Sequence, residues 1–552
     1  SDTSDHSTDF NSNFVDPQVY SGLISFKNDI FSLGKMIKFI MSDKNPEKNE
    51  LTKQQKSFFN EIYKKCTDSK IENRFSINDI IVSFFVNFPY TISKSSIVID
   101  PHILTFIGLF YVKQNRIDIA IYYLKLAADQ NSYRAQYSLG VIYSSSKNKE
   151  FDIDKAIYYY TLSAEQNYVE AQNNLGSIYF KSEYIDRNIN KAIYFFALAA
   201  NQNSIEAQYN LGIIYITGNY IKQDVNKAIY YFSLAAKQND SESQYNLGCI
   251  YCNRKYGKFN INSAINYYLQ AANNNNKNAQ YSLGFIYFNN EYVTRDINKS
   301  IHYFHLAANN NHPNAQNLLG LIYQNKEFRI YDIKKSIYYF QLAANQNNID
   351  AIYNLGLIYF IQQDIKKAIN YFTQAANQNH VDAQYNLGMI FLDGKYIKKN
   401  INKGLRLLIS AANYGNGHAQ HNLGTFYYEG KIVERDVQKA IYYYSLSAQQ
   451  KFITAYYNLA MIFYEGYYVV KNVYKAIHYF KLAANQNHKT SLFNLGCIYY
   501  DNIDVPRDIN KSLRYFSLAA KLNHGNSLFN LGVIYSEGVH VQKNMNKAIY
   551  YY

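Results

Sequence analysis

Apolar residues recur along most of the chain in short segments with helical spacing. In residues 224–236, apolar side chains occupy positions 225, 228, 229, 232, 235 and 236. These positions lie on one face of an α-helix and do not alternate as in a β-strand. A second apolar segment, residues 207–215, comes before it and contains a Leu-Gly pair. The pattern predicts two helices in succession, helix A around the Leu-Gly pair and helix B after it.

The helix pair is repeated through most of the sequence, and the glycine of the Leu-Gly pair marks each copy. Ala460 fills one of these glycine slots, and Gly108 marks a first, less typical copy. Two steps are 32 residues instead of 36, and the missing residues lie between helix A and helix B. We therefore expect a loop there that tolerates deletion. The period is 36 residues for the other steps, and the glycines are Gly140, Gly176, Gly212, Gly248, Gly284, Gly320, Gly356, Gly388, Gly424, Gly496 and Gly532.

Both ends of helix B carry capping signals. Three residues after its Ala-Ala or Ser-Ala pair comes Asn in ten copies, with Gly415 and Lys451 in two others. Asn and Gly favour the left-handed conformation that ends a helix. At the start of helix B, 12 copies have Asp or Asn as a potential N-cap, and Arg116 stands in that slot in the remaining copy. These N-cap residues are Asp152, Asn188, Asp224, Asn260, Asp296, Asp332, Asp364, Asn400, Asp436, Asn472, Asp508 and Asn544.

The small residues of both helices predict close packing. Gly in helix A and the Ala pair in helix B are expected to remove bulk where two backbones approach. Ala460 in a glycine slot favours this explanation over a left-handed backbone, which would disfavour a methyl group. One helix pair cannot bury both of its faces, so stability must come from stacking neighbouring repeats. The fold class is therefore all-α, an α-solenoid of helix-turn-helix repeats.

The repeat motif identifies a family. The pattern Ala-x-x-x-Leu-Gly-x-x-Tyr, followed by Asp-x-x-Lys-Ala-x-x-Tyr-x-x-x-Ala-Ala, resembles the Sel1-like repeat, a relative of the tetratricopeptide repeat. The resemblance covers residues 101–552, with the last repeat incomplete. It implies a right-handed superhelix whose concave face binds protein partners, and a scaffold or adaptor role without catalysis.

The residues before the array resemble a different family. Residues 1–13 read as a flexible segment, residues 14–88 resemble the end of a protein-kinase C-lobe with a small set of helices, and residues 89–100 form a linker. In this resemblance Asp29 matches the aspartate that braces the catalytic loop. Arg74 matches the arginine that pairs with the glutamate of Ala-Pro-Glu, and Gln18 stands in that glutamate slot.

The sequence carries no complete set of kinase motifs. It has no Gly-rich loop, Val-Ala-Ile-Lys, His-Arg-Asp or Asp-Phe-Gly motif. Without them these 552 residues should bind no ATP and transfer no phosphate, and no other cofactor is indicated. We take them to be a segment of a longer parent. If the parent carries those motifs upstream, it would bind ATP, and the array would be the targeting arm of an active Ser/Thr-type kinase. If it does not, the array is a scaffold attached to a pseudokinase.

Composition narrows the cellular setting. No apolar stretch is long enough to span a bilayer, and no charged-then-apolar leader opens the sequence. Four cysteines in 552 residues suit a reducing compartment and cannot form a disulfide framework. The sequence therefore predicts a cytoplasmic protein that does not act at a membrane.

One column of aromatic residues is the best candidate for a partner-binding surface. It lies three residues before the glycine slot of helix A, which faces the concave groove in tetratricopeptide arrays by resemblance. Aromatic side chains are strong anchors at interfaces. The alternative is that they pack between successive A helices. This aromatic column comprises Tyr137, Tyr209, Tyr245, Tyr281, Tyr353, Tyr385, Tyr457, Phe493 and Phe529.

A second column places lysine in the first turn of helix B. Stacked lysines could form a basic ridge for an acidic partner or nucleic acid. A local pair with the N-cap three residues earlier is the favoured explanation, because no aromatic-plus-basic groove pattern accompanies the ridge. This lysine column comprises Lys155, Lys191, Lys227, Lys299, Lys335, Lys367, Lys403, Lys439, Lys475, Lys511 and Lys547.

Three pairs of metal-ligating residue types stand one helical turn apart. Cys249 and Cys252 match apolar positions in other copies, so we expect core fillers. The other two pairs lack a nearby third ligand, so no metal site is predicted. They are His302 with His305, and His418 with His421.

Overall fold

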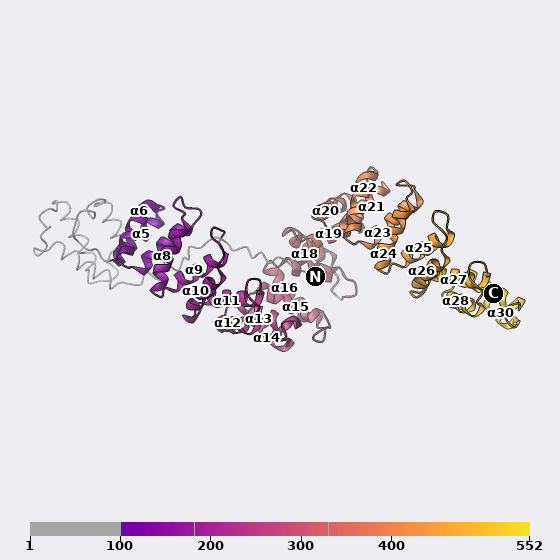
Figure 1. Cartoon of the computed structure of the whole chain (residues 1–552), viewed down its shortest axis with the longest axis horizontal. Coiled ribbons are helices and arrows are strands. Elements are labelled where there is room, and N and C mark those ends of the chain that lie inside the picture. Colours follow the sequence, from indigo (N-terminus) through magenta and orange to yellow (C-terminus); the bar gives the residue numbers. More distant parts are fainter. Residues whose placement is uncertain (1–63, 65–100, 182, 329) are drawn as a thin grey trace, which may run out of the picture. The chain divides into compact units, whose positions relative to one another are not determined.

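The computed structural model describes residue 64 and residues 101–181, 183–328 and 330–552. Helices of the A and B types alternate through these ranges, with no strand, and one short 3₁₀ helix, η4 (Arg254–Tyr256), follows α13 (Figure 1). The predicted all-helical solenoid is confirmed. The A helices are α5 (Pro101–Lys113), α7 (Tyr133–Ser144), α9 (Val169–Lys181), α11 (Ile205–Thr217), α13 (Ser241–Cys252), α15 (Lys277–Phe288), α17 (Pro313–Gln324), α19 (Ile349–Ile361), α21 (Val381–Asp393), α23 (Gly417–Glu429), α25 (Ile453–Glu465), α27 (Lys489–Asp501) and α29 (Gly525–Glu537).

Each A helix packs against the B helix that follows it. The B helices are α6 (Ile117–Asp129), α8 (Ile153–Glu165), α10 (Ile189–Asn201), α12 (Val225–Lys237), α14 (Ile261–Asn273), α16 (Ile297–Asn309), α18 (Ile333–Ala344), α20 (Ile365–Asn377), α22 (Ile401–Asn413), α24 (Val437–Gln449), α26 (Val473–Ala484), α28 (Ile509–Lys521) and α30 (Met545–Tyr551).

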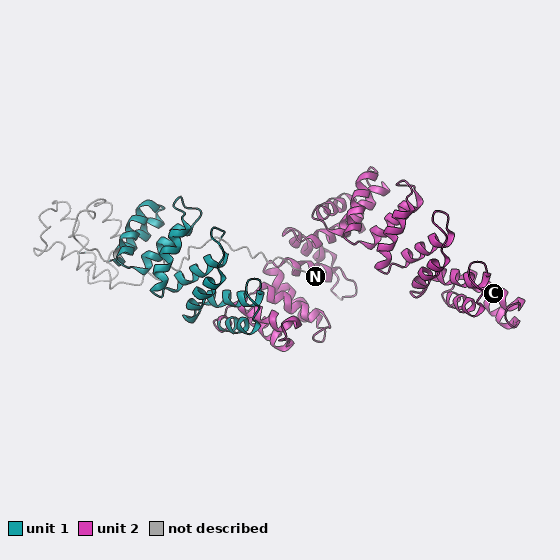
Figure 2. Ribbon diagram, viewed as in Figure 1, with its two compact units in different colours: residues 1–234 teal, residues 235–552 magenta. Residues whose placement is uncertain are grey.

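The molecule divides into two compact units. Unit 1 ends at Leu234 and unit 2 begins at Ala235, so the division falls within α12 (Figure 2). Successive A helices touch one another within each unit, as α5 with α7 and α17 with α19, and more extensively than successive B helices do in the described residues. Each unit therefore has one face formed by a row of A helices.

The predicted capping residues adopt their expected roles. Each Asp or Asn at the N-cap of helix B accepts a hydrogen bond from a first-turn amide, as Asp152 does from Lys155 N at 3.0 Å. Arg116 makes no such bond. The predicted Asn residues after helix B have φ between 55° and 64°, and Lys451 holds the same conformation at φ 63°. The turn after helix B therefore keeps its left-handed residue even where the residue type, here Lys451, does not favour positive φ.

Most of the glycine slots accommodate an aromatic ring of helix B. A Cβ atom on Gly284 would lie 2.6 Å from the Phe304 ring of helix B, and one on Gly140 would lie 2.5 Å from the Tyr160 ring. The expectation that two backbones approach here is wrong for most copies, because a side chain of helix B fills the space. The small residue is required for packing and not for a left-handed turn, as predicted, since no glycine in these slots has positive φ.

The two shortened repeats lose residues from the A–B loop, as expected. Only residues 114–116 connect α5 to α6, and only residues 362–364 connect α19 to α20. Asn115 and Gln363 take positive φ there and complete the turn. The helix pairs on either side stay intact, which explains why this loop tolerates deletion.

Buried glutamines of the A helices join neighbouring repeats. Gln316 donates from Nε2 to Ala308 O at the end of the preceding B helix, at 3.1 Å. Its Oε1 accepts from Gln346 Nε2, at the end of its own repeat's B helix, at 2.8 Å. Ala308 O also accepts from Asn311 N at 3.0 Å, so the glutamine adds a second hydrogen bond to this helix-terminal carbonyl. Such bonds to both neighbouring B helices fix the register of the stack.

Candidate interaction surface on the A helices

The aromatic column lies on the A-helix face and is half-buried in the structure. Its members are partly exposed from Tyr137 to Phe493, and Phe529 is 59% exposed. In most copies the ring contacts an aromatic side chain of helix B in its own repeat, as Tyr281 does with Phe304 at 5.9 Å between ring centroids. The column thus contributes to packing and still presents part of each ring to solvent.

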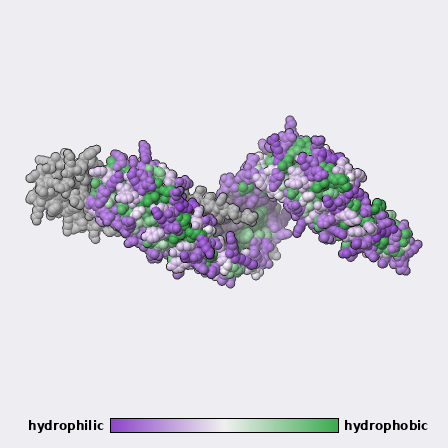
Figure 3. All heavy atoms as spheres, viewed as in Figure 1, coloured by the Kyte–Doolittle hydropathy of each residue, from purple (hydrophilic) through white to green (hydrophobic). Residues whose placement is uncertain are grey.

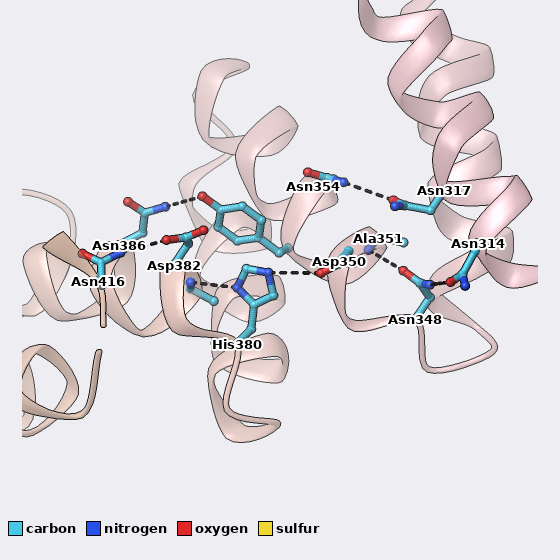
Figure 4. A network of polar contacts seen from close by, with 12 residues as sticks. Asn314, Asn317, Asn348, Asp350, Ala351, Asn354, His380, Asp382, Asn386 and Asn416 are labelled. Atoms are coloured by element: carbon cyan, nitrogen blue, oxygen red, sulfur yellow. Dashed lines mark hydrogen bonds and ion pairs between the residues drawn. The ribbon is translucent and has the colours of Figure 1, made fainter. Parts of the chain in front are cut away.

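Polar side chains link the aromatic column from one repeat to the next. Asn386 Nδ2 donates to Tyr353 OH at 3.2 Å, and Asn422 Nδ2 donates to Tyr385 OH at 3.3 Å. These asparagines belong to an asparagine column, two residues before the glycine slot. Figure 4 shows the Asn386 bond beside the equivalent bond from Asn354 to Asn317, which measures 3.1 Å. Packing between successive A helices, the alternative to partner binding, is therefore present.

The N-caps of the A helices form a second row of contacts at the helix starts. Asn416 Nδ2 donates to the Asp382 carboxylate of the preceding repeat at 2.8 Å, and Asn348 Nδ2 donates to Asn314 Oδ1 at 2.9 Å (Figure 4). The same cap side chains accept from first-turn amides, as Asn348 Oδ1 does from Ala351 N at 2.9 Å. One residue therefore caps a helix and also ties two repeats together.

Histidine takes this N-cap position in four A helices. His312 Nδ1 accepts from Ala315 N at 3.2 Å, and its ring stacks on Tyr281 with 4.5 Å between centroids. Burial, with a smaller contribution from Lys277, lowers the pKa of His312 to about 4. Only the neutral ring can accept at Nδ1, so protonation would remove the cap. The four histidines are His312, His380, His488 and His524.

The outward stripe of the A helices carries polar and charged groups around an apolar centre. In α21, residues Asp382, Asn386, Met389 and Asp393 are four, three and four positions apart, which places them on one face of the helix. Both aspartates are exposed, and the two middle residues are half-buried. Figure 3 shows apolar side chains interspersed with hydrophilic ones over the visible face of unit 2. The outward stripe of α21 is therefore only partly exposed and not broadly apolar.

The lysine column is engaged within its own repeat. Lys227 Nζ lies 5.0 Å from the centre of the Tyr215 ring of helix A and 4.0 Å from Asp224 Oδ2. Every lysine of the column has such a ring beneath it, including Phe391 under Lys403 and Phe463 under Lys475. The favoured local pair is present: Asp N-caps form ion pairs with lysines of the column, as Asp224 does with Lys227. The cation–π contact adds to this pair.

The cysteine and histidine pairs have contacts of their own. Tyr268 OH donates to Cys249 Sγ at 3.5 Å, and burial raises the pKa of both Cys249 and Cys252. His305 lies between Tyr323 OH at 3.1 Å and Tyr339 OH at 3.0 Å. Among the residues that the structure describes, no group of three or more His, Cys, Asp or Glu is placed to hold a metal ion.

The remaining pair, His418 and His421, lies on α23 and also contacts neighbouring repeats. His418 packs edge-on against Phe452 at 4.8 Å, and Asn458 Nδ2 lies 3.2 Å from His421 Nε2. His421 thus occupies the slot of the aromatic column and contacts the asparagine of the next repeat.

No helix in the described ranges has the length and apolar character needed to cross a membrane.

Several of these residues were not singled out from the sequence. The asparagine column and the histidine N-caps recur with the repeat period, so the aligned copies contain the signal. Their pairing between repeats could not be predicted, because it depends on how adjacent helix pairs stack. Gln18, Asp29 and Arg74, the kinase-like positions, lie outside the described residues.

Solved structures that resemble this chain include proteins with Sel1-like folds. A protective antigen of uropathogenic Escherichia coli that displays an SLR fold is 26% identical, with a TM-score of 0.56, over 85% of its own length and 72% of this chain. A Sel1 repeat protein of Oxalobacter formigenes is 25% identical over 97% of its own length and 44% of this chain, with a TM-score of 0.36. An immunity protein of Pseudomonas aeruginosa is 19% identical over 81% of its own length and 38% of this chain, with a TM-score of 0.26. No curated protein matches the sequence.

Family models match most of the array. A model of plant tetratrico peptide repeats matches residues 326–413. The Sel1 repeat model matches ten segments, at residues 104–132, 134–168, 169–204, 205–240, 241–276, 277–312, 417–452, 453–488, 490–524 and 525–552. These segments make up more than half of the 552 residues, and with the alternating helices and the ring-filled glycine slots they show that the chain belongs to the Sel1 repeat family.

Proposed function

We propose that this chain is a protein-interaction scaffold whose partners bind the A-helix face through the aromatic column. Sel1 repeats generally mediate protein–protein interactions, which supports this class of function over catalysis. The observation that carries the proposal is the column itself, which places aromatic rings with exposed surface at the same slot of nine A helices. Rigid, half-exposed aromatic rings anchor partners at low entropic cost.

The packing role of the column does not compete with binding. Tyr353 is held between His380, which stacks on it at 4.4 Å, and Asn386, which donates to its hydroxyl. A ring held on two sides loses little conformational freedom when a partner covers its third side. These contacts between repeats therefore pre-organise the ring for a partner.

A crosslinking experiment tests which face is used. A photoreactive phenylalanine analogue replaces Tyr281 on the A-helix face in one full-length variant and Tyr338 on helix B in a second. Tyr338 is 55% exposed and contacts its neighbour Tyr339 edge-on. Partners crosslinked from Tyr281 and not from Tyr338 support the proposal, and the reverse pattern overturns it.

Substitution gives an independent measurement. The variant combining Tyr245→Ala, Tyr281→Ala and Tyr353→Ala should lose crosslinked partners, while Tyr338→Ala with Tyr442→Ala should keep them. Circular dichroism of both variants controls for loss of helix. Partner binding that survives the first variant with its helices intact contradicts a role for the aromatic column.

Two further hypotheses remain at the level of prediction. Attachment to a kinase-like domain depends on residues outside the described part of the chain. Nucleic-acid binding by the lysine column is not favoured, because each lysine already lies over an aromatic ring and several are paired with an Asp. A salt titration of nucleic-acid binding would test the second, since phosphate contacts weaken steeply with salt.

A further inference from the structure

The last five A helices share a column of carboxylates at their C-terminal ends. It lies five residues after the glycine slot, and four of its members are exposed, with Glu465 half-buried. In helical spacing this position shares a face with the asparagine column, seven residues earlier, and with the residue one after the glycine slot. The carboxylate column comprises Asp393, Glu429, Glu465, Asp501 and Glu537.

Each of these helices thus presents the same sequence of groups along its outward stripe. An asparagine comes first, then a small or apolar side chain, then the carboxylate. The asparagines are Asn386, Asn422, Asn458, Asn494 and Asn530. The residues one after the glycine slot are Met389, Thr425, Met461, Cys497 and Val533, and all five are half-buried. The stripe therefore combines shallow apolar contact with hydrogen-bond acceptors.

Some basic residues near the carboxylate column have other partners, although the charge of Arg507 also acts on Asp501. Arg435 donates from Nε to Tyr428 O at 3.0 Å and its guanidinium lies 4.7 Å from the centre of the Tyr468 ring. Lys471 pairs with Asp504 in the following loop. Within the described residues, the one ion pair that reaches the column joins Lys431 to Glu429 at 3.0 Å, where both side chains are well exposed.

Charge is divided between the two kinds of helix. From α21 to α29 the A helices carry six acidic residues and the single base Lys489, whereas the B helices α22 to α28 carry eight basic residues and no acid. The whole sequence has a formal charge of +14. An acidic stripe on a basic protein favours cationic partners at that one face.

We propose that the A-helix face from α21 to α29 binds a Lys- or Arg-rich segment of a partner protein in extended conformation. This inference rests on the proposed function and names the class of partner. Neighbouring A helices lie about 10 Å apart. A peptide in the extended polyproline II conformation has three residues per turn and rises about 3.1 Å per residue, so every third side chain faces the same way. Every third residue of such a segment therefore meets a successive carboxylate, and the apolar side chains between them meet the centre of the stripe.

A peptide-binding measurement tests this on the full-length protein. The probe is a fluorescein-labelled peptide of about 15 residues that repeats Lys-Gly-Leu, and its counterpart repeats Glu-Gly-Leu. Fluorescence anisotropy should show binding of the lysine peptide, weakening between about 0.05 M and about 0.5 M salt. Preference for the glutamate peptide, or no binding of the lysine peptide, overturns the proposal.

Charge-matched variants locate the site. The first variant combines Asp393→Asn, Glu429→Gln, Asp501→Asn and Glu537→Gln, and should weaken lysine-peptide binding at least about tenfold. The control neutralises the four acidic residues of α6 and α8, which are Asp118, Asp129, Asp154 and Glu165, and should change binding less than about twofold. Equal losses in both variants would mean that bulk charge alone attracts the peptide, and would overturn the site.

The outcome separates this inference from the proposed function. If partners still crosslink at Tyr281 while the lysine peptide fails to bind, the scaffold function stands and the basic partner class is wrong. If the peptide binds as expected and no partner crosslinks at Tyr281, the carboxylate stripe stands and the role of the aromatic column fails.

Discussion

Replacing the N-cap histidine of α17 should remove a pH-dependent contribution to stability. His312 is 8% exposed, accepts from Ala315 N through Nδ1 and stacks on Tyr281. The positively charged groups facing it include Lys277, which disfavours a second positive charge. His312→Asn keeps an acceptor at the cap, as Asn348 does for α19, and cannot take up a proton.

The magnitude follows from the difference between the two states. The ordinary histidine pKa of about 6.5 applies to the unfolded chain, and the folded pKa is about 4. The unfolded state therefore binds the proton more readily, so stability is complete above pH 6.5 and falls as the pH decreases toward 4. The full loss is about 3 kcal/mol, of which about 2 kcal/mol is lost by pH 5.

Urea unfolding at pH 7 and pH 5 provides the assay, with hydrogen exchange of α17 amides to localise the effect, because a repeat array can unfold in parts. The wild type should lose about 2 kcal/mol more than His312→Asn between the two pH values. His302→Asn, on the exposed face of α16, is the control and should behave as the wild type. Identical pH dependence of the wild type and His312→Asn would refute the reasoning.

Two further substitutions test packing and hydrogen bonding. Gln384 Oε1 is buried without a partner, because Tyr414 stands where most other repeats end helix B with Gln or Asn. Tyr414→Gln should raise the urea midpoint by an amount equivalent to about 1 kcal/mol, and an unchanged midpoint would contradict this. Gly284→Ala places a methyl group 2.6 Å from the Phe304 ring and should cost about 1–3 kcal/mol by thermal or urea unfolding, whereas Gly525→Ala meets nothing within 4 Å and should be neutral.

The sequence alone determined the repeat and its helices. Local signals are enough for this: the 36-residue period, the N-cap Asp or Asn, and the Asn that takes positive φ all act within a few residues of where they stand. The shortened A–B loops could be predicted for the same reason, because a 32-residue step between glycine slots shows directly where residues are missing. The sequence also predicted that a small residue was needed in the glycine slot, as Ala460 indicates.

Only the tertiary structure decided what each column contacts. The glycine slot faces the ring of Phe304 or its equivalent, the lysine column lies over rings such as Tyr215, and the aromatic column is tied to asparagines such as Asn386. These partners belong to the other helix of the pair or to the next repeat, so no local pattern selects among them. The stacking of helix pairs brings them together, because the apolar faces of one repeat are buried only by its neighbours.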